Sequence, residues 1–162
     1  MQHIPVYTIA AYSGTGKTTY LERLIPALRT RGLRVAIVKH DAHEFDIDRK
    51  GKDSWRFTQA GAEVTAVVSG TKAAWIESRP LEMDAVLSRI RDVDLILTEG
   101  YKSGPWPKIG LYRQGAGKGL ALPLAECVAV VSDVPLQAPC PVFPLGDPEP
   151  LADWLAGRIQ TG

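Results

Sequence analysis

The residues with the clearest chemical meaning lie at positions 11–19, which read Ala-Tyr-Ser-Gly-Thr-Gly-Lys-Thr-Thr. This stretch matches the phosphate-binding pattern G-x-x-x-x-G-K-[ST], except that Ala11 replaces the first glycine. Gly14 and Gly16 allow the backbone to curl so that successive N–H groups face phosphate oxygens. Lys17 is the cation that reaches the β- and γ-phosphates in such loops. The sequence therefore predicts a loop that binds a nucleotide through its phosphates.

The pattern carries this meaning only where a strand precedes it and a helix follows. Residues 6–10 are an apolar run typical of a buried strand, and residues 17–31 show the leucine spacing of an amphipathic helix. Gly32 is the expected end of that helix. The positive end of the helix dipole would add to phosphate binding. The predicted nucleotide-binding residues of this segment are Ser13, Gly14, Thr15, Gly16, Lys17, Thr18 and Thr19.

A magnesium ion is expected beside the phosphates, held by the Thr18 hydroxyl and by an acid at a strand end. Residues 94–99 form an apolar strand with an acid at each end. Active groups of parallel sheets lie at the carboxyl ends of strands, so Glu99 is predicted to face the metal or its water. Asp94 is expected to be a solvated residue at the strand start. Lys17 and Glu99 are the predicted catalytic residues.

A second acidic segment, residues 39–48, follows the predicted strand at 35–38 and contains two histidines and four acids. Asp46 or Asp48 is predicted to approach Mg²⁺ directly or through water. A transition-metal site and an exposed polar loop are the alternatives. Lys52 is a candidate phosphate contact, and Asp53 or Ser54 could cap a helix that begins near Trp55.

Selection of the base and of a second ligand would involve the C-terminal half of the chain. Asp133 ends a predicted strand and could accept hydrogen bonds from guanine N1–H and N2–H₂, although a turn or cap is an equal alternative. Residues 101–122 are rich in glycine, proline and cations, and Arg113 and Lys118 are candidate contacts for a phosphorylated second ligand. The glycine-rich stretch 114–119 is interpreted as either an anion cradle or a flexible surface loop.

Strands and helices alternate along the 162 residues, which predicts one P-loop domain over 1–162. The expected fold is a three-layer α/β/α arrangement with a mostly parallel sheet. An antiparallel pair at residues 64–68 and 73–76 is expected at one edge. Helices are also expected at 81–91 and 148–159, with strands at 93–97, 109–112 and 127–131.

Composition excludes several classes of protein. The net charge of +1 argues against binding nucleic acid through bulk charge. The longest uncharged stretch, residues 134–146, contains four prolines and cannot be a membrane span. No signal peptide is recognised in the sequence. Cys127 and Cys140 are the only cysteines, so a disulfide framework is not expected. A cytoplasmic location is expected.

Several motifs in this order resemble the molybdopterin-guanine dinucleotide biosynthesis protein B family. They are residues 11–19, Val-Lys-His at 38–40, Asp-x-x-Gly-Lys-Asp-Ser at 48–54, Thr-Glu-Gly-Tyr-Lys at 98–102 and Ala-Val-Val-Ser-Asp at 129–133. The resemblance implies a GTP-binding P-loop protein with weak, Mg²⁺-dependent GTPase activity that forms a homodimer. It also implies that the protein assists a guanylyltransferase, the enzyme that joins GMP to molybdopterin. Molybdopterin is itself a candidate ligand of this protein. Ala11 and the glycine loop at 115–119 depart from the family pattern.

Two other functions are open at this point. A small-molecule kinase that uses ATP would need an arginine-bearing lid, and residues 101–119 contain only one arginine. A dimeric scaffold whose docking is controlled by nucleotide would expose aromatic residues, for which Tyr101, Trp106 and Trp75 are candidates. Packing in the core is the expected place of Trp75.

Overall fold

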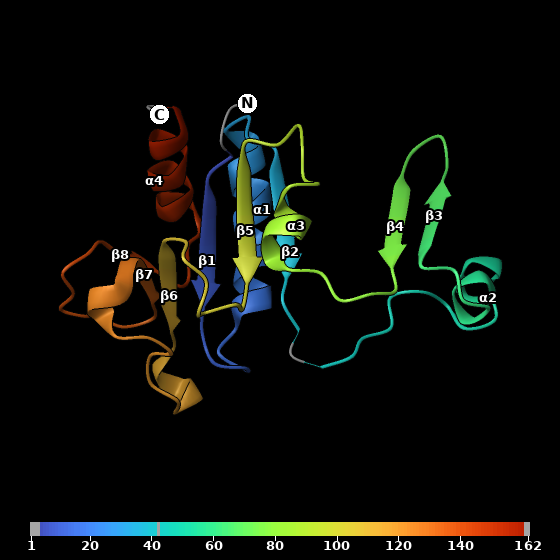
Figure 1. Cartoon of the computed structure of the whole chain (residues 1–162). Coiled ribbons are helices and arrows are strands. Elements are labelled where there is room, and N and C mark those ends of the chain that lie inside the picture. Colours follow the sequence, from blue (N-terminus) through green and yellow to red (C-terminus); the bar gives the residue numbers. More distant parts are fainter. Residues whose placement is uncertain (1–3, 42, 161–162) are drawn as a thin grey trace. The chain divides into compact units, whose positions relative to one another are not determined.

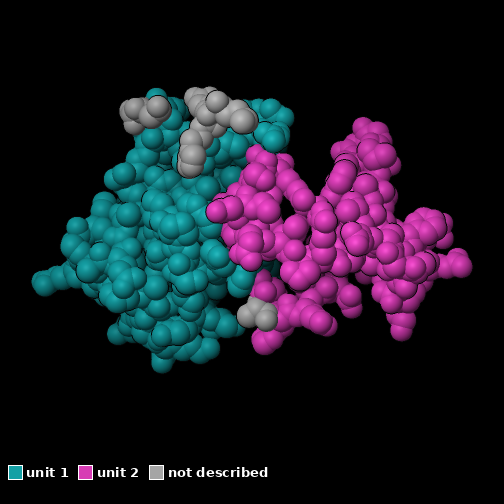
Figure 2. All heavy atoms as spheres, in the orientation of Figure 1, with its two compact units in different colours: residues 1–40, 91–162 teal, residues 41–90 magenta. Residues whose placement is uncertain are grey.

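The computed structural model describes residues 4–41 and 43–160. The chain divides into two compact units, residues 1–40 with 91–162 and residues 41–90, which are coloured separately in Figure 2. The first unit is therefore built from two stretches of sequence, with the second unit inserted between them. That the whole chain folds as one domain stays a prediction.

The first unit contains a six-stranded, all-parallel sheet with the strand order β2-β5-β1-β6-β7-β8. Apolar runs form the four central strands because both faces of a parallel sheet are buried. The predicted α/β class with a parallel sheet is thus confirmed. The strands are β1 (Val6–Ala10), β2 (Val35–Lys39), β5 (Leu95–Glu99), β6 (Lys108–Tyr112), β7 (Cys127–Ser132) and β8 (Val142–Pro144).

Two long helices, α1 (Lys17–Thr30) and α4 (Glu149–Gln160), pack on each other and join one core with the sheet (Figure 1). The core takes alternate residues of the central strands together with the apolar faces of both helices. Short 3₁₀ turns, η1 (Gln114–Ala116) and η2 (Leu124–Glu126), lie between β6 and β7. Among the described residues, no helix combines the length and the apolar character needed to span a bilayer.

Helix α1 ends as the sequence predicts. Gly32 adopts a left-handed conformation, with φ of 79°, and its N–H donates to the Arg29 carbonyl. The Leu33 N–H donates to the carbonyl of Leu28, and both leucines are buried. This pair of hydrogen bonds and the apolar contact form a Schellman end, which satisfies carbonyls that a helix otherwise leaves unpaired.

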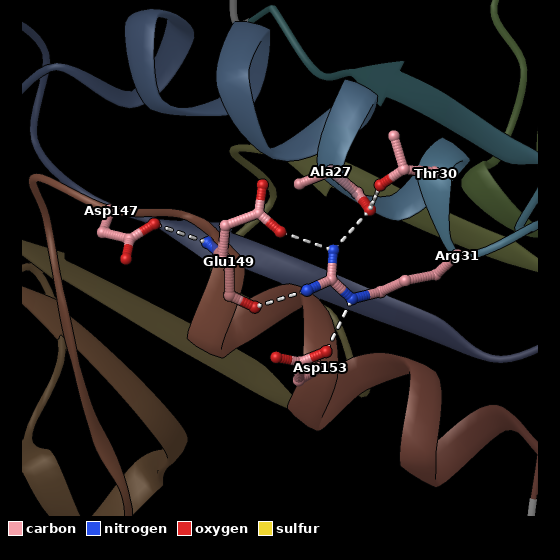
Figure 3. A network of polar contacts seen from close by, with 6 residues as sticks. All are labelled: Ala27, Thr30, Arg31, Asp147, Glu149 and Asp153. Atoms are coloured by element: carbon pink, nitrogen blue, oxygen red, sulfur yellow. Dashed lines mark hydrogen bonds and ion pairs between the residues drawn. The ribbon is translucent and has the colours of Figure 1, made fainter.

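A polar clamp fixes the C-terminal end of α1 to the start of α4 (Figure 3). The Arg31 guanidinium donates to the carboxylates of Glu149 and Asp153, each at 2.7 Å. It also donates to the Ala27 carbonyl at 2.7 Å. The hydrogen bond from Arg31 lowers the pKa of Asp153, so this carboxylate stabilises the fold above its ordinary pKa and loses that contribution as the pH falls through the lowered value.

The second unit contains the helices α2 (Asp53–Gln59) and α3 (Met83–Leu87) and a hairpin of β3 (Val64–Val68) and β4 (Ala73–Glu77). The predicted antiparallel pair is confirmed, but it forms a two-stranded sheet of its own rather than lying at an edge of the parallel sheet. The Ser69 hydroxyl closes its turn through the carbonyl of Lys72. The Glu77 carboxylate, only 6% exposed, pairs with Arg79 and Arg89 and so joins β4 to the segment after α3.

Four sequence predictions need correction within these units. The helix expected at 81–91 is limited to Met83–Leu87, and the strand expected at 93–97 is Leu95–Glu99. Helix α2 begins at Asp53, so neither Asp53 nor Ser54 caps it, and its N-cap residue Lys52 makes no side-chain capping bond. The Trp75 side chain is 69% exposed rather than packed in the core, because β4 belongs to a sheet with a single partner strand.

Candidate functional site

The glycine loop connects β1 to α1 at the carboxyl edge of the parallel sheet. Gly14 and Gly16 have φ of 78° and 102°, a region that L-residues with side chains avoid. The first helical hydrogen bond of α1 runs from the Tyr20 N–H to the Gly16 carbonyl, so the N–H groups of residues 17–19 have no acceptor within the helix.

The N-terminus of α1 also lacks the side chains that usually accept hydrogen bonds from, or place a negative charge beside, the first N–H groups of a helix. No side chain caps it, and its first turn contains no acidic residue. A 14-residue helix of this kind presents unpaired N–H groups and the positive end of its dipole. Such an end is suited to an anion, and phosphate is the anion that the loop sequence predicts.

Three consecutive loop residues each contact an ammonium group from a different segment. Lys17 Nζ donates to the Ala11 carbonyl at 3.2 Å, and Lys118 Nζ donates to the Ser13 carbonyl at 2.8 Å. Lys102 Nζ lies 4.8 Å from the centre of the Tyr12 ring. The loop therefore concentrates positive charge at its start, in addition to the helix dipole.

The predicted loop residues differ in what they offer a ligand. Ser13, Thr18 and Thr19 are exposed. The Thr15 hydroxyl is buried and has no hydrogen-bond partner among the described residues, while the Thr15 N–H donates to the Tyr12 carbonyl at 3.3 Å. The Thr15 backbone N–H thus closes the turn of the loop.

Glu99 reaches the same sheet edge because β5 pairs directly with β1. In the parallel register Glu99 lies opposite Ile9 of β1 and Lys39 of β2. Its side chain is half-buried. The exposed Thr18 hydroxyl and the Glu99 carboxylate are hard oxygen ligands of the type that Mg²⁺ prefers, so these two residues fit the predicted metal.

A buried hydroxyl pair fixes the register of these two strands. Thr8 Oγ1 and Thr98 Oγ1 lie 2.9 Å apart, opposite one another on β1 and β5, and neither residue is exposed. A slip of one residue would turn both hydroxyls away from each other. The pair therefore positions Glu99 relative to the loop.

Asp94 lies at the opposite end of β5 and takes no part in this edge. Its carboxylate accepts hydrogen bonds from the Arg34 side chain and from the Arg34 N–H, at 2.7 to 3.1 Å. These bonds lower the pKa of Asp94. The choice of Glu99 over Asp94 agrees with this geometry.

Asp133, just beyond the end of β7, holds the glycine loop that follows β6. Its Oδ1 accepts from the Gln114 N–H at 2.9 Å, which anchors the start of η1. A carboxylate accepts about four hydrogen bonds, so capacity for a ligand is left. Arg113 is exposed beside this anchor, and Lys118 extends from the same loop to Ser13.

Asp46, Asp48 and Lys52 belong to the second unit. Asp46 and Lys52 are exposed. Asp48 Oδ1 accepts from the Arg49 N–H, while Oδ2 is buried without a partner among the described residues. Residues 43–48 line a cleft of about 1060 Å³ with α2 and β4. No group of three or more metal-ligating side chains occurs among the residues described, which leaves the alternative of a transition-metal site without support.

Sequence reasoning missed a strained aromatic turn directly after Glu99. Gly100 and Tyr101 have φ of 85° and 53°, and a side chain at Gly100 would come within 3.1 Å of the His40 carbonyl. The Tyr101 ring lies between His40 and Trp106, at centroid distances of 4.9 and 5.6 Å. The glycine after a strand was a signal for the turn, but a left-handed tyrosine has no sequence signature.

The strand, the glycine loop with its lysine, and the uncapped helix define a P-loop protein of the α/β class. Comparison with known proteins gives the family: the profile of MobB, molybdopterin guanine dinucleotide synthesis protein B, matches residues 6–133. The chain belongs to this family.

Relatives match along nearly the whole chain. The molybdopterin-guanine dinucleotide biosynthesis adapter protein of Escherichia coli is 41% identical and aligns over 97% of this chain and 94% of its own. The crystal structure of a MobB homologue from Bacillus stearothermophilus is 31% identical, with a TM-score of 0.66 over 97% of this chain and 99% of its own. The Bacillus subtilis MobB structure is 25% identical, with a TM-score of 0.76 over 96% and 98%.

The Thr8–Thr98 pair gives a prediction for stability. Thr8→Val or Thr98→Val leaves one buried hydroxyl unpaired and should lower the free energy of unfolding by about 1–3 kcal/mol. The double variant removes both polar groups with little change in shape and should lose less than the sum of the single changes. Urea unfolding of the four proteins measures this coupling, and strictly additive losses would contradict a positioning bond.

Proposed function

We propose that this protein binds GTP with Mg²⁺ and acts as an adapter in the synthesis of molybdopterin guanine dinucleotide, assisting a guanylyltransferase. The observation that supports nucleotide binding best is the uncapped start of α1 beneath a glycine loop with Lys17. Membership of the MobB family and the function named for its relatives support the pathway.

Phosphate binding in this proposal uses the Lys17 ammonium and the N–H groups of residues 14–19, of which that of Thr15 would leave the Tyr12 carbonyl. On binding, the Lys17 ammonium exchanges the Ala11 carbonyl for phosphate oxygens, a charged partner in place of a neutral one. Thr18 and Glu99 are the proposed contacts for Mg²⁺ and its water in this unit. Arg113 is a proposed contact for a phosphorylated second ligand such as molybdopterin. Asp46, Asp48 and Lys52 belong to the second unit, and their part in binding Mg²⁺ or a second ligand stays a prediction.

Guanine selection is assigned to Asp133. Guanine offers two adjacent donors, N1–H and N2–H₂, which a carboxylate can accept together, whereas adenine lacks this pair. Asp133 is exposed at the carboxyl edge of the sheet, where ligands of α/β proteins bind.

Weak GTPase activity is the proposed chemistry. Water attacks the γ-phosphorus, the bond to the β,γ-bridging oxygen breaks, and GDP and phosphate leave. Glu99 would accept a hydrogen bond from a water on the metal side of the γ-phosphate. No glutamine lies in either predicted metal-binding segment to orient the attacking water, so the isolated protein should turn over slowly.

Homodimer formation is proposed from the second unit. No apolar side chain of its described residues is buried, and Phe45, Ile47, Phe57, Val68 and Trp75 are each at least 60% exposed. Apolar exposure on this scale is typical of surfaces that pack against another chain. Sedimentation equilibrium at micromolar concentration should give twice the chain mass of 17.6 kDa, and the single-chain mass would contradict the proposal.

Competition binding tests the nucleotide. A fluorescent GTP analogue with Mg²⁺ should bind the protein, and GTP should displace it far better than ATP does. Lys17→Ala should weaken binding about 10-fold to 100-fold, the range for losing one charge-assisted hydrogen bond, while the circular dichroism spectrum stays unchanged. Equal displacement by ATP would instead favour the kinase.

Glu99→Gln tests the metal assignment. The variant keeps the shape of the side chain but loses the charge, so GTP turnover and its dependence on Mg²⁺ should decrease more than GTP affinity does. Asp94→Asn, at the other end of the same strand, is the matched control and should retain turnover. Unchanged turnover and Mg²⁺ dependence in Glu99→Gln would remove this residue from the site.

A further inference from the structure

Lys118 is a cation of the site whose placement the nucleotide-binding motif does not explain. It lies 105 residues from Ser13 in the sequence, yet its Nζ donates to the Ser13 carbonyl at 2.8 Å. The same ammonium is 3.9 Å from the position that a Cβ on Gly14 would occupy. Lys118 therefore lies directly on the phosphate loop.

The backbone on both sides of Lys118 adopts a glycine-dependent conformation that accompanies its contact with Ser13. Gly117 and Gly119 have φ of 66° and 63°, so left-handed residues flank the lysine on both sides. The start of the segment is held by the Asp133 carboxylate through the Gln114 N–H at 2.9 Å. One end of the glycine loop is thus fixed beside the proposed base contact, and the other end touches the proposed phosphate site.

The position of Lys118 also indicates which phosphate it would meet. The Lys17 ammonium contacts the Ala11 carbonyl, two residues before Ser13, and the lysine of such loops reaches the β- and γ-phosphates. Lys118 Nζ lies at this same end of the loop. Its present acceptor is a neutral carbonyl, and a phosphate oxygen with a full charge is a stronger one.

We propose that Lys118 is a second phosphate-binding lysine, supplied by the glycine loop of the same chain, which transfers from the Ser13 carbonyl to the terminal phosphate of the bound nucleotide. This inference rests on the proposed nucleotide site. It makes the affinity depend on the number of phosphates, because Lys118 would bind the terminal phosphate of a triphosphate and would return to the Ser13 carbonyl when that phosphate leaves. Asp133 is then a positioning residue for Lys118 as well as the proposed base contact.

Nucleotides of different phosphate number test the proposal on the full-length protein. Affinities for a non-hydrolysable GTP analogue, GDP and GMP are measured with Mg²⁺ by displacement of a fluorescent GTP analogue. Lys118→Ala should weaken binding of the triphosphate about 10-fold to 100-fold, as expected for one charge-assisted hydrogen bond, and should leave GMP binding unchanged. Lys118→Arg, which keeps the charge, should restore most of the triphosphate affinity.

Two further variants separate the possible outcomes. Arg29→Ala removes one exposed positive charge near the far end of α1 and should bind all three nucleotides as the unmodified protein does. An equal loss for all three nucleotides in Lys118→Ala would show that Lys118 only braces the loop and would overturn the proposal. A normal triphosphate affinity in Lys118→Ala, together with a loss in Lys17→Ala, would overturn it while leaving the nucleotide site intact. Failure of the unmodified protein to bind any of the three would overturn the nucleotide site and this inference together.

Discussion

The parallel pairing of β1 with β5 is the constraint on which the site depends. These strands are far apart in sequence, yet one rung of their register brings Ile9 and Glu99 opposite one another. The buried Thr8–Thr98 hydrogen bond makes this register specific, because any other alignment leaves two hydroxyls unpaired inside the sheet. The glycine loop and an acidic residue therefore meet at one edge of the sheet because of this register.

The two units contrast in how they bury apolar surface. The buried apolar residues of the described chain all belong to the first unit, where α1, α4 and the sheet share a core. No apolar side chain is buried among the described residues of the second unit, where the largely buried Thr65 and Glu77 are both polar. A hairpin with two short helices has too little apolar area to form a core of its own. The second unit in isolation should consequently be less stable than the first unit.

Much of the first unit could be predicted from the sequence, because its determinants are local. A strand, a glycine loop and an amphipathic helix follow one another within residues 6–32, and each has a composition that few other structures share. The placement of Glu99 required only the rule on strand ends in parallel sheets. The prediction that α1 ends at Gly32 required only the known preference for glycine just after a helix.

The features that escaped prediction depend on tertiary contacts. The sequence near residue 118 does not indicate that this lysine contacts Ser13. The contact requires the β6–β7 connection to reach the loop that follows β1. The exposure of Trp75 depends on which sheet β4 joins, and an apolar strand pattern reads the same in either sheet. The predicted capping by Asp53 or Ser54 was wrong because the helix begins two residues earlier than Trp55, which places both residues inside its first turn.

The strand order has a consequence for synthesis on the ribosome. When the first forty residues have emerged, the segments that form β1 and β2 are available but are not sheet neighbours, because β5 lies between them in the folded sheet. The nascent chain thus holds open strand edges until residue 99 is made. The clamp from Arg31 closes later still, when residues 149–153 leave the exit tunnel. The glycine loop can accordingly lie beside Glu99 only after β5 has been synthesised.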